Sequence, residues 1–498
     1  MRMPDPALAK TLTAVSPRFS PPPTPLLAKV IYGSVLALWV LLFARAFLLD
    51  DVFAWSAGIV YVSYDTVLLL FVFWQTFGLI RRPAPLPAPG RHISVGVIVA
   101  AHNEASVLPV TLAALFAQTD PPDQVLIADD GSTDATPETL ARLYGLVAPA
   151  VGTVSAPSPT HPALRWFRLP HGGKAVALNA ALTRIDTEMM MTVDADTLLD
   201  PEAVGAMRRA FAAEPELVAA TGILTPVCSG SASGRFFEWF QTYEYIRNFL
   251  SRYAWARLDS LLLISGAFAG FRRAAVVEVG GFDPDCLVED YELIHRLKRH
   301  ATLKGVRWTT RVLGAARART DAPGTVGAFL RQRRRWFGGF LQTQYWYRAM
   351  VGDGRYGWLG TAMLPVKAID TMQPIYGLVA FALLVFYLVT GRFSLVNPVA
   401  GVIGAKIVLD LAFYLWVDRA VSPLGGRAVP GEPVLCHHRG DRGAVQLPVA
   451  AAYRGGLGLG VFPDRAAAMG HAGGGSGWCR RRWRGRRRLS GRLRPARP

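Results

Sequence analysis

Residues 124–132 read Gln-Val-Leu-Ile-Ala-Asp-Asp-Gly-Ser, an apolar run of strand length that ends on two aspartates and a glycine. Apolar runs of the same kind occupy residues 93–100, 164–169 and 189–193. Segments with helical spacing separate them, and strands that alternate with helices form a parallel sheet with right-handed crossovers. The sequence therefore predicts an α/β domain over residues 91–324. Its expected helices are 107–118, 136–144 and 174–182.

Acidic residues follow two of these expected strands. Asp129 and Asp130 close the second strand, and Asp194-Ala195-Asp196 begins where the fourth strand ends. Ligands of open parallel sheets bind outside the carboxyl ends of the strands. The two motifs therefore predict one ligand site at that edge of the sheet.

The spacing of Asp194 and Asp196 suits a divalent cation. Alternate residues in a strand-to-loop turn can point the same way, so two carboxylates can face one Mg²⁺ or Mn²⁺ whose other ligands are phosphate oxygens and water. The alternative is an ordinary acidic surface loop. Asp129 and Asp130 are expected to accept from a base or ribose hydroxyl or to lie near the metal, and the alternative for this motif is a capped turn.

Two further motifs suggest a base and a phosphate contact. Asp290, beside Glu289, precedes a helical stretch, where the helix N-terminus favours an anion that can take a proton. The alternative is a helix cap. Lys174 follows two glycines at an expected helix start, where its ammonium and the backbone N–H groups could meet phosphate.

The segment Gln332-Arg333-Arg334-Arg335-Trp336 combines guanidinium groups with an indole. Such a segment could clamp a diphosphate, and the ring of Trp336 could stack on a sugar. The alternative is an interfacial anchor for lipid headgroups, which could be the whole role of Arg331, Arg333 and Arg334. Residues 325–350, which contain it, predict an amphipathic helix at a membrane interface.

Membrane-length apolar segments frame the expected α/β domain. Two lie within residues 29–80, at 30–49 and 58–80, and two within residues 372–417. About 20 apolar residues cross a bilayer, and the Arg81-Arg82 pair predicts a cytoplasmic location for the α/β domain after it. The alternative is a buried helical hairpin. Residues 1–28 show no periodicity and predict a disordered leader.

Composition agrees with a multi-pass membrane protein that carries a large soluble domain. Of the 498 residues, 51% are hydrophobic, and mean hydropathy is +0.25. Four cysteines without paired spacing predict no disulfide framework and no zinc site, which favours a reducing cytosol. The net charge of +18 does not indicate a nucleic-acid partner, because residues 426–498 hold 15 Arg against three acidic residues and the body is nearly balanced.

That basic, low-complexity tail over residues 426–498 has two interpretations. It is either a genuine disordered basic tail or a stretch translated out of frame from a GC-rich gene, in which a frameshift has replaced a last spanning helix. Reading the gene for a continuing frame separates them.

In their fixed order these motifs resemble those of the inverting family 2 glycosyltransferases. The resemblance is greatest to the processive membrane synthases of the poly-β-1,6-N-acetylglucosamine synthase type, with cellulose, chitin and hyaluronan synthases as relatives. It runs from about Ser94 to Gln344. The landmarks are residues 97–104, 129–132, 173–179, 194–196, 265–267, 289–290 and 332–336. The tail departs from the pattern, since relatives usually have a further spanning helix there.

The resemblance implies a GT-A (Rossmann-like) domain inserted between transmembrane helices of the cell inner membrane, with the catalytic domain cytoplasmic. It implies transfer of GlcNAc or another hexose from a UDP-sugar to a growing β-linked polysaccharide, with Mg²⁺ or Mn²⁺ as cofactor. An accessory synthase subunit and membrane lipids are the expected additional partners. The resemblance also implies a role for each motif: Asp129, Asp130 and Lys174 contact UDP; Asp194 and Asp196 hold UDP and metal; Asp290 is the general base; Gln332, Arg335 and Trp336 bind diphosphate and acceptor.

Two other functions stay open from the sequence. One is a non-processive glycosyltransferase with a lipid acceptor, which would give single-sugar lipid products. The other is a remnant that binds UDP without turnover. The size of the product and the release of UDP distinguish the three.

Overall fold

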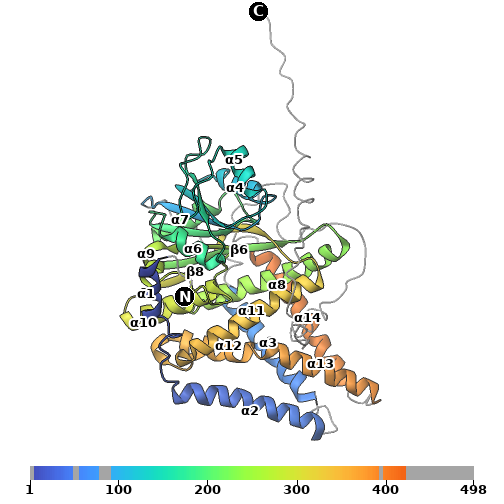
Figure 1. Cartoon of the computed structure of the whole chain (residues 1–498). Coiled ribbons are helices and arrows are strands. Elements are labelled where there is room, and N and C mark those ends of the chain that lie inside the picture. Colours follow the sequence, from blue (N-terminus) through green and yellow to red (C-terminus); the bar gives the residue numbers. More distant parts are fainter. Residues whose placement is uncertain (1–4, 49–54, 78–90, 392–395, 422–498) are drawn as a thin grey trace, which may run out of the picture.

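The computed structural model describes residues 5–48, 55–77, 91–391 and 396–421 (Figure 1). The Arg81-Arg82 pair and the tail over residues 426–498 lie outside the described residues. The soluble domain is built on an eight-stranded sheet with the order β3-β2-β1-β4-β7-β6-β8-β5.

The first half of the sheet follows the predicted pattern. Strands β1 (Val95–Ala101), β2 (Gln124–Asp130), β3 (Leu164–Leu169) and β4 (Met189–Asp194) are all parallel. Apolar side chains alternate between the two faces of each strand, so Val97 and Val99 pack in one core and Ile98 in the other. The connecting helices are α4 (Leu108–Phe116), α5 (Thr136–Tyr144) and α6 (Lys174–Leu182).

The second half of the sheet corrects the expectation of a wholly parallel sheet. Strand β7 (Phe268–Arg272) runs antiparallel to both β4 and β6 (Leu217–Val227). Strand β8 (Thr309–Asp321) is parallel to β6 and antiparallel to the short β5 (Thr197–Leu199). Helices of this half are α7 (Ala203–Ala213), α9 (Arg273–Glu278) and α10 (Glu289–Lys304). The domain is a GT-A-like mixed sheet covered by helices.

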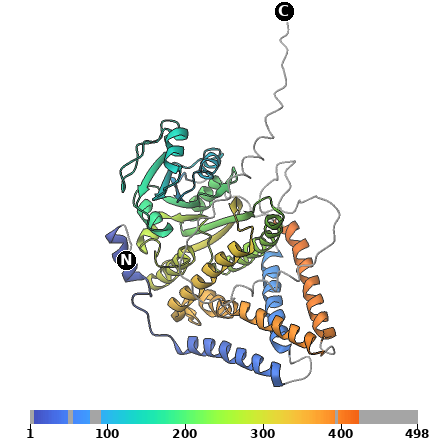
Figure 2. The same cartoon turned by 45° about the vertical axis from the view of Figure 1, so that its right-hand side comes forward.

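Three helices lie between this sheet and the most apolar helices. They are α8 (Ala232–Ala256), α11 (Val326–Trp346) and α12 (Leu364–Asp370), and Figures 1 and 2 show them below the sheet. Helix α11 begins one residue after the predicted start, with Thr325 as its N-cap, and ends four residues before the predicted end, ahead of a 3₁₀ turn over Arg348–Met350.

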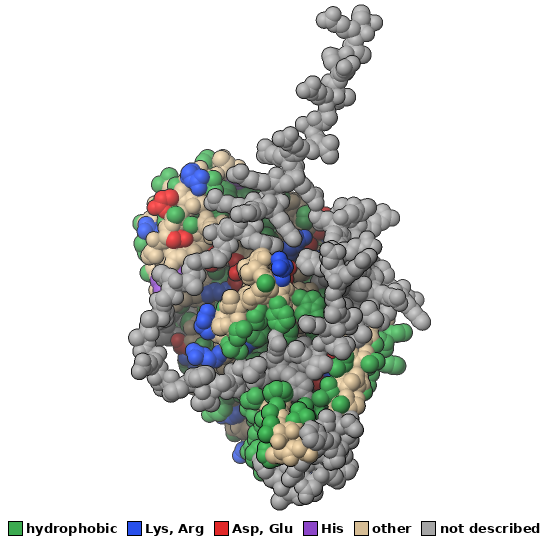
Figure 3. All heavy atoms as spheres, turned by 90° about the vertical axis from the view of Figure 1, so that its right-hand side faces the viewer, with side chains coloured by type: hydrophobic (Ala, Val, Ile, Leu, Met, Phe, Trp, Pro, Cys, Tyr) green, Lys and Arg blue, Asp and Glu red, His purple; other side chains and the backbone are tan. Residues whose placement is uncertain are grey.

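The apolar helices are α2 (Leu26–Leu48), α3 (Ser56–Thr76), α13 (Gln373–Val389) and α14 (Val396–Val421). Within the described residues, Leu26–Arg45 and Ser56–Thr76 are long and apolar enough to cross a membrane, and the bent pair of Leu359–Asp370 with α13 could form a third span. Figure 3 shows apolar side chains gathered at this end of the molecule. The candidate spans therefore have the length and composition of membrane-crossing helices.

Charged side chains meet where α3, α8 and α14 pack. The Asp65 carboxylate pairs with Arg247 of α8, and its second oxygen lies 2.8 Å from the Lys406 ammonium. Lys406 also pairs with Asp410 one turn along α14. A charge in an apolar setting needs such partners, so these pairs make the packing of the three helices specific.

The N-terminal residues are not a disordered leader over their described length. Residues 6–15 form helix α1 (Pro6–Val15), in which the Asp5 side chain caps the N-terminus by accepting from the Ala7 N–H at 2.7 Å. Leu8 and Leu12 are buried. The helix was missed because its apolar face is only two leucines wide, and the ends of the segment are rich in proline.

Candidate active site

Asp129 and the ring of Trp166 lock the end of β2 against β3. One Asp129 carboxylate oxygen accepts from the Ser132 N–H at 2.9 Å and the other from the Trp166 indole N–H at 3.0 Å. The side chain is 1% exposed. Both carboxylate oxygens therefore accept hydrogen bonds from within the protein, and Asp129 supports the residues that form the site.

Asp130 holds the loop that precedes α6. Its carboxylate accepts from the N–H groups of Gly172, at 2.7 Å, and Gly173, at 3.0 Å. The His171 ring nitrogen lies 3.0 Å from the same carboxylate. Gly131 has φ +70°, and a Cβ there would lie 2.7 Å from the backbone nitrogen of His171. Only glycine therefore lets the two loops approach each other this closely.

The turn after β1 is tied to the turn after β2. Asn103 adopts φ +59°, a left-handed conformation that asparagine tolerates, and its side-chain oxygen accepts from the Thr133 and Asp134 N–H groups at 2.8 and 3.2 Å. Its own N–H donates to the Ser132 hydroxyl at 3.0 Å. These bonds bring the residues that follow β1 to the same edge as the aspartates.

Lys174 links the two acidic motifs of the site. Its ammonium lies 2.5 Å from Asp194 and 3.9 Å from Glu289, the neighbour of Asp290. Burial alone would lower the pKa of this ammonium, but the carboxylates of Asp194 and Glu289 raise the pKa above its usual value. The lysine is thus a fixed positive charge between β4 and the start of α10.

Around Asp194 and Asp196, carboxylates are crowded. Burial and the charges of Asp194 and Asp321 raise the pKa of Asp196 to about 6. Burial and the charges of Asp196 and Asp134 raise the pKa of Glu104 to about 7. Carboxylates that disfavour one another's ionisation suit a bound cation, which would relieve the repulsion.

Asp290 is oriented by backbone groups. One of its oxygens accepts from the Gly266 N–H at 2.6 Å and the other from the Tyr291 N–H at 2.8 Å. A Cβ on Gly266 would lie 3.1 Å from the Asp290 carboxylate, so the glycine permits this close approach. Each oxygen keeps a free lone pair that can accept a proton.

Helix α11 places its predicted residues in different settings. Arg333, expected at the lipid surface, is instead buried and donates to Glu244 of α8 at 2.6 Å. Its guanidinium lies 4.3 Å from the ring centroid of Trp336, while Arg335 is exposed. The lipid-anchor interpretation is therefore wrong for Arg333, since its ion pair with the half-buried Glu244 holds it against α8.

On helices α8 and α11, two polar groups are buried and have no hydrogen-bond partner within the described part of the chain. They are Gln332 Oε1, on α11, and Arg252 Nε, on α8. Burial lowers the pKa of Arg252, against the opposing charges of Tyr245 and Asp290. An unpaired buried polar group is costly, so both are candidates to bind a polar ligand.

The structure offers two places for a metal ion. The first is the Asp194–Asp196 pair predicted from the sequence. The second is His102, Asp130 and His171, whose ligand atoms lie within 4.8 Å of one another in the described chain. The two rings stack with centroids 4.4 Å apart. Because the Asp130 carboxylate already holds Gly172 and Gly173, the first place has the more available oxygens.

Sequence reasoning missed several residues around the site. They are Glu104, Asp321, Glu244 and Arg252. Glu104 followed the first expected strand, just as the acidic motifs followed theirs, and that position was a usable signal. Asp321, Glu244 and Arg252 come from β8 and α8, neither of which the sequence predicted, so no pattern marked them.

The sequence matches two related family models. Residues 96–280 match the model described as glycosyl transferase family 2, and residues 189–396 match glycosyl transferase family group 2. The overlapping matches together span β1 through α13, which contains every side chain of the site described above.

Individual relatives agree with the models. The chain is 27% identical over 245 residues to a poly-β-1,6-N-acetyl-D-glucosamine synthase of Staphylococcus epidermidis, covering 49% of this chain and 53% of that protein. It is 28% identical over 241 residues to the synthase of the same name from Staphylococcus aureus, covering 48% and 52%. The match therefore spans about half the length of these relatives.

Among solved structures, the fold is similar to that of a mannosyltransferase from Pyrobaculum calidifontis in complex with GDP-Man and Mn²⁺. The TM-score is 0.53 at 20% identity, and the match covers 74% of this chain and 96% of that one.

Proposed function

Because residues 96–280 match glycosyl transferase family 2 and residues 189–396 match glycosyl transferase family group 2, we propose that the protein transfers a hexose from a UDP-sugar onto a growing β-linked polysaccharide at a membrane. GlcNAc is the favoured hexose, because the relatives with 27–28% identity are named as poly-β-1,6-N-acetyl-D-glucosamine synthases. The proposed location is the inner membrane, with the catalytic domain cytoplasmic. An accessory synthase subunit is the proposed protein partner.

One observation carries the proposal. The Lys174 ammonium lies 2.5 Å from Asp194 and 3.9 Å from Glu289, so a single cation joins the end of β4 to the residue beside Asp290. A sugar transfer needs a place for the leaving diphosphate next to a base for the attacking hydroxyl. The contacts of Lys174 support this proposal, because they bring the proposed diphosphate position and the proposed base close together.

In the proposed mechanism, Asp290 accepts the proton of the acceptor hydroxyl. The hydroxyl oxygen then bonds to the anomeric carbon as the bond from that carbon to the UDP oxygen breaks, which inverts the configuration. Gly266 and Tyr291 fix the carboxylate through their N–H groups. Lys174 and Arg252 are the cations available to the charge that develops on the leaving diphosphate.

Asp194 and Asp196 would hold Mg²⁺ or Mn²⁺. The donor set fits such an ion, since oxygen ligands are those that both ions prefer and since the crowded carboxylates have raised pKa values. When bound, the ion would neutralise diphosphate charge. Asp130, Asp129 and Lys174 are the proposed contacts or supports for UDP, and Gln332, Arg335 and Trp336 those for diphosphate and acceptor.

The test is UDP release by the full-length protein in membranes, against a panel of UDP-sugars, with linkage analysis of the product. Asp290→Asn should keep UDP binding and lower turnover by about 10²–10⁴-fold, the usual contribution of a general base. Retained turnover in this variant would remove Asp290 from the role. Absence of UDP release from the unaltered protein would favour a remnant that only binds UDP.

A lipid acceptor is the second candidate function. The exposed Arg331, Arg334 and Arg335 lie on α11, which is positioned between the sheet and the apolar helices. Guanidinium groups there could bind a lipid-linked phosphate. Products that contain a single sugar on a lipid would establish this function, and long β-linked chains would exclude it.

A further inference from the structure

Helix α1 docks directly onto the soluble domain. Leu12 is fully buried, and its backbone meets Gly280, where a Cβ would lie 2.3 Å from the Leu12 nitrogen. Gly280 also has φ +88°, so this position favours glycine twice over. Arg299 of α10 donates to the Val15 carbonyl at 2.9 Å. The N-terminal segment is therefore a packed part of the domain.

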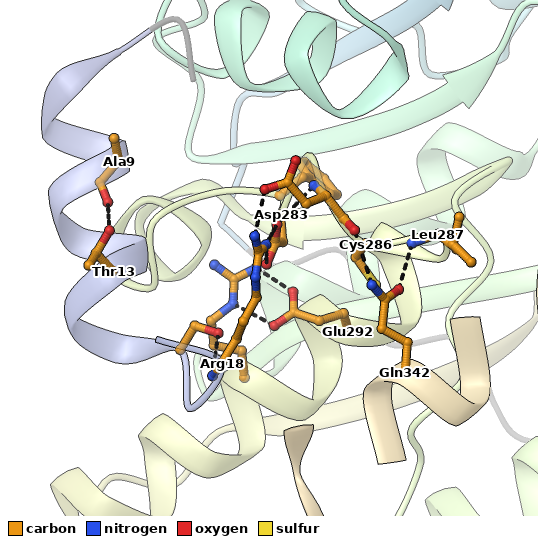
Figure 4. A network of polar contacts seen from close by, with 12 residues as sticks. Ala9, Thr13, Arg18, Asp283, Cys286, Leu287, Glu292 and Gln342 are labelled. Carbon is orange, nitrogen blue, oxygen red and sulfur yellow. Dashed lines mark hydrogen bonds and ion pairs between the residues drawn. The ribbon is translucent and has the colours of Figure 1, made fainter. Parts of the chain in front are cut away.

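Just after this helix, Arg18 forms a forked contact with two aspartates (Figure 4). Its Nη1 lies 2.6 and 2.8 Å from the two Asp283 oxygens, and its Nη2 lies 2.6 Å from Asp285. The Asp283 side chain is 0% exposed. A buried carboxylate requires a partner, and a planar guanidinium matches two acceptors with little freedom of orientation.

Other elements hold the two ends of the loop that carries these aspartates. At its start, the Asn179 side chain of α6 accepts from the Phe282 N–H and donates to the Phe282 carbonyl, both at 2.7 Å. At its end, the Gln342 side chain of α11 accepts from the Leu287 N–H at 3.0 Å and donates to the Asp285 carbonyl at 3.1 Å. Between these anchors, the Arg18 fork joins Asp283 near the start of the loop to Asp285 near its end.

The loop leads straight into the proposed base. Val288 ends it against Gly339 of α11, where a Cβ would lie 2.4 Å from the valine side chain, and α10 begins at the next residue with Glu289 and Asp290. Asp285 precedes Asp290 by only five residues, and the loop continues without a break into α10. A displacement of the loop would therefore be passed to the start of α10, which carries the base.

We infer that Arg18 is a positioning residue for the transfer reaction, which it serves by fixing the loop over residues 282–288 and hence the Asp290 carboxylate. The inference rests on the proposed function, because it takes Asp290 as the base. It assigns a catalytic consequence to a segment far from the donor site in sequence.

The test compares Arg18→Gln with the unaltered full-length protein in lipid nanodiscs. We expect kcat to fall about tenfold or more, because small displacements of a reacting group carry large rate penalties. The KM for the UDP-sugar and the affinity for UDP should change less than about twofold, since the donor contacts lie on other elements. Arg18→Lys should restore part of the rate, because an ammonium keeps the charge without the fork.

Arg91→Gln is the matched control. Arg91 pairs with Glu188 at 2.5 Å, but its side chain is 74% exposed and it precedes β1 at the opposite edge of the sheet. The Arg91→Gln substitution should leave kcat unchanged. Unchanged kcat in Arg18→Gln, or equal losses of kcat and UDP affinity, would overturn the inference, and so would a loss of rate explained wholly by a smaller folded fraction.

Hydrogen exchange separates this inference from the proposed function. In Arg18→Gln, the amides of Asp285, Cys286 and Leu287 should exchange about tenfold faster, and those of β1 should not change. If the unaltered protein released no UDP, the proposed function would fail while the exchange result still showed whether Arg18 orders the loop. Unaltered exchange in this loop would overturn the positioning role even in an active enzyme.

Discussion

Two pairs of aspartates lie at the carboxyl ends of β2 and β4, the strands on either side of β1, and their surroundings differ. Asp129 and Asp130, at the end of β2, are buried, and their carboxylates accept hydrogen bonds from backbone or indole N–H groups. At the end of β4, Asp194 pairs with the Lys174 ammonium at 2.5 Å, while burial and neighbouring carboxylates raise the pKa of Asp196 to about 6. The first pair is satisfied by N–H groups of the fold, whereas Asp196 in the second pair lies among like charges.

The difference distinguishes carboxylates that stabilise the loops of a site from carboxylates that can bind its ligand. A buried carboxylate that accepts from N–H groups of the surrounding loops stabilises those loops. Crowded carboxylates reduce the stability of the metal-free protein, and a cation restores what they lose. The acidic motifs look alike in the sequence, but only the second pair has the electrostatics of a ligand site.

The largest expected effect is on catalysis at β4. Asp196→Asn should lower kcat/KM by about 10³-fold, roughly 4 kcal/mol in the activation barrier, because the divalent ion loses a ligand. Its melting temperature in the absence of metal should not fall, since the substitution relieves repulsion. The control is Asp186→Asn, at an exposed position that precedes the same strand. It should match the unaltered protein in both kcat/KM and melting temperature. A lower melting temperature in Asp196→Asn would show that Asp196 stabilises the fold as the β2 aspartates do, and would contradict the difference between the two pairs.

A second prediction concerns stability at β2. Asp130→Asn should lower the free energy of unfolding by about 3 kcal/mol, because an amide replaces a carboxylate that accepts from Gly172 and Gly173. Chemical denaturation in detergent followed by tryptophan fluorescence measures this loss. If Asp130→Asn were as stable as the unaltered protein but failed to bind UDP, Asp130 would be a ligand residue and not a structural one.

The pH dependence of metal binding tests the crowded pair further. Glu104 and Asp196 have raised pKa values, about 7 and about 6, so each holds its proton more tightly in the folded than in the unfolded protein. The metal-free protein should therefore lose stability as the pH rises from about 4.5 to about 7. Over the same range Mn²⁺ affinity should rise by about 10³-fold or more, because the ion displaces both protons.

Calorimetric titration with Mn²⁺ at several pH values measures that affinity. Glu104→Gln removes the group with the higher pKa, so the rise should level off earlier in this variant. An affinity independent of pH would show that the crowded carboxylates are not the metal ligands, and would turn attention to His102, Asp130 and His171.

The smallest expected effect comes from the indole that supports Asp129. Trp166→Phe keeps an aromatic ring in the core and removes only the N–H that donates to Asp129 at 3.0 Å. We expect a loss of about 1 kcal/mol in the free energy of unfolding, the net value of one hydrogen bond, with UDP affinity unchanged. A large loss of UDP affinity would place Asp129 among the ligand contacts.

The sequence predicted the first half of the sheet well because its patterns are local. The helices at 136–144 and 174–182 and the strand at 164–169 have the predicted bounds, since each has unbroken periodicity and a clear end. The β6–β8 region was not predicted. Its pairings depend on contacts between distant segments, as in β7, which lies between β4 and β6, and periodicity does not record such contacts.

The candidate site shows the same division. The aspartates at strand ends could be found because their place in the sheet follows from parallel topology. The burial of Arg333 could not, because it depends on Glu244 from α8. Likewise, helix α1 owes its order to the surface that receives Leu8 and Leu12, which lies more than 250 residues away in the sequence.

The contact between Arg18 and Asp283 also constrains how the chain between them can cross a membrane. Two residues in an ion pair lie on one side of a bilayer, and no described helix between Arg91 and Asp283 has the length and hydropathy of a span. Under the membrane location proposed above, α2 and α3 would then form an outward and a returning pass. In that arrangement, a chain that inserted only one of the two helices would leave Arg18 and Asp283 on opposite sides of the bilayer, and their ion pair could not form.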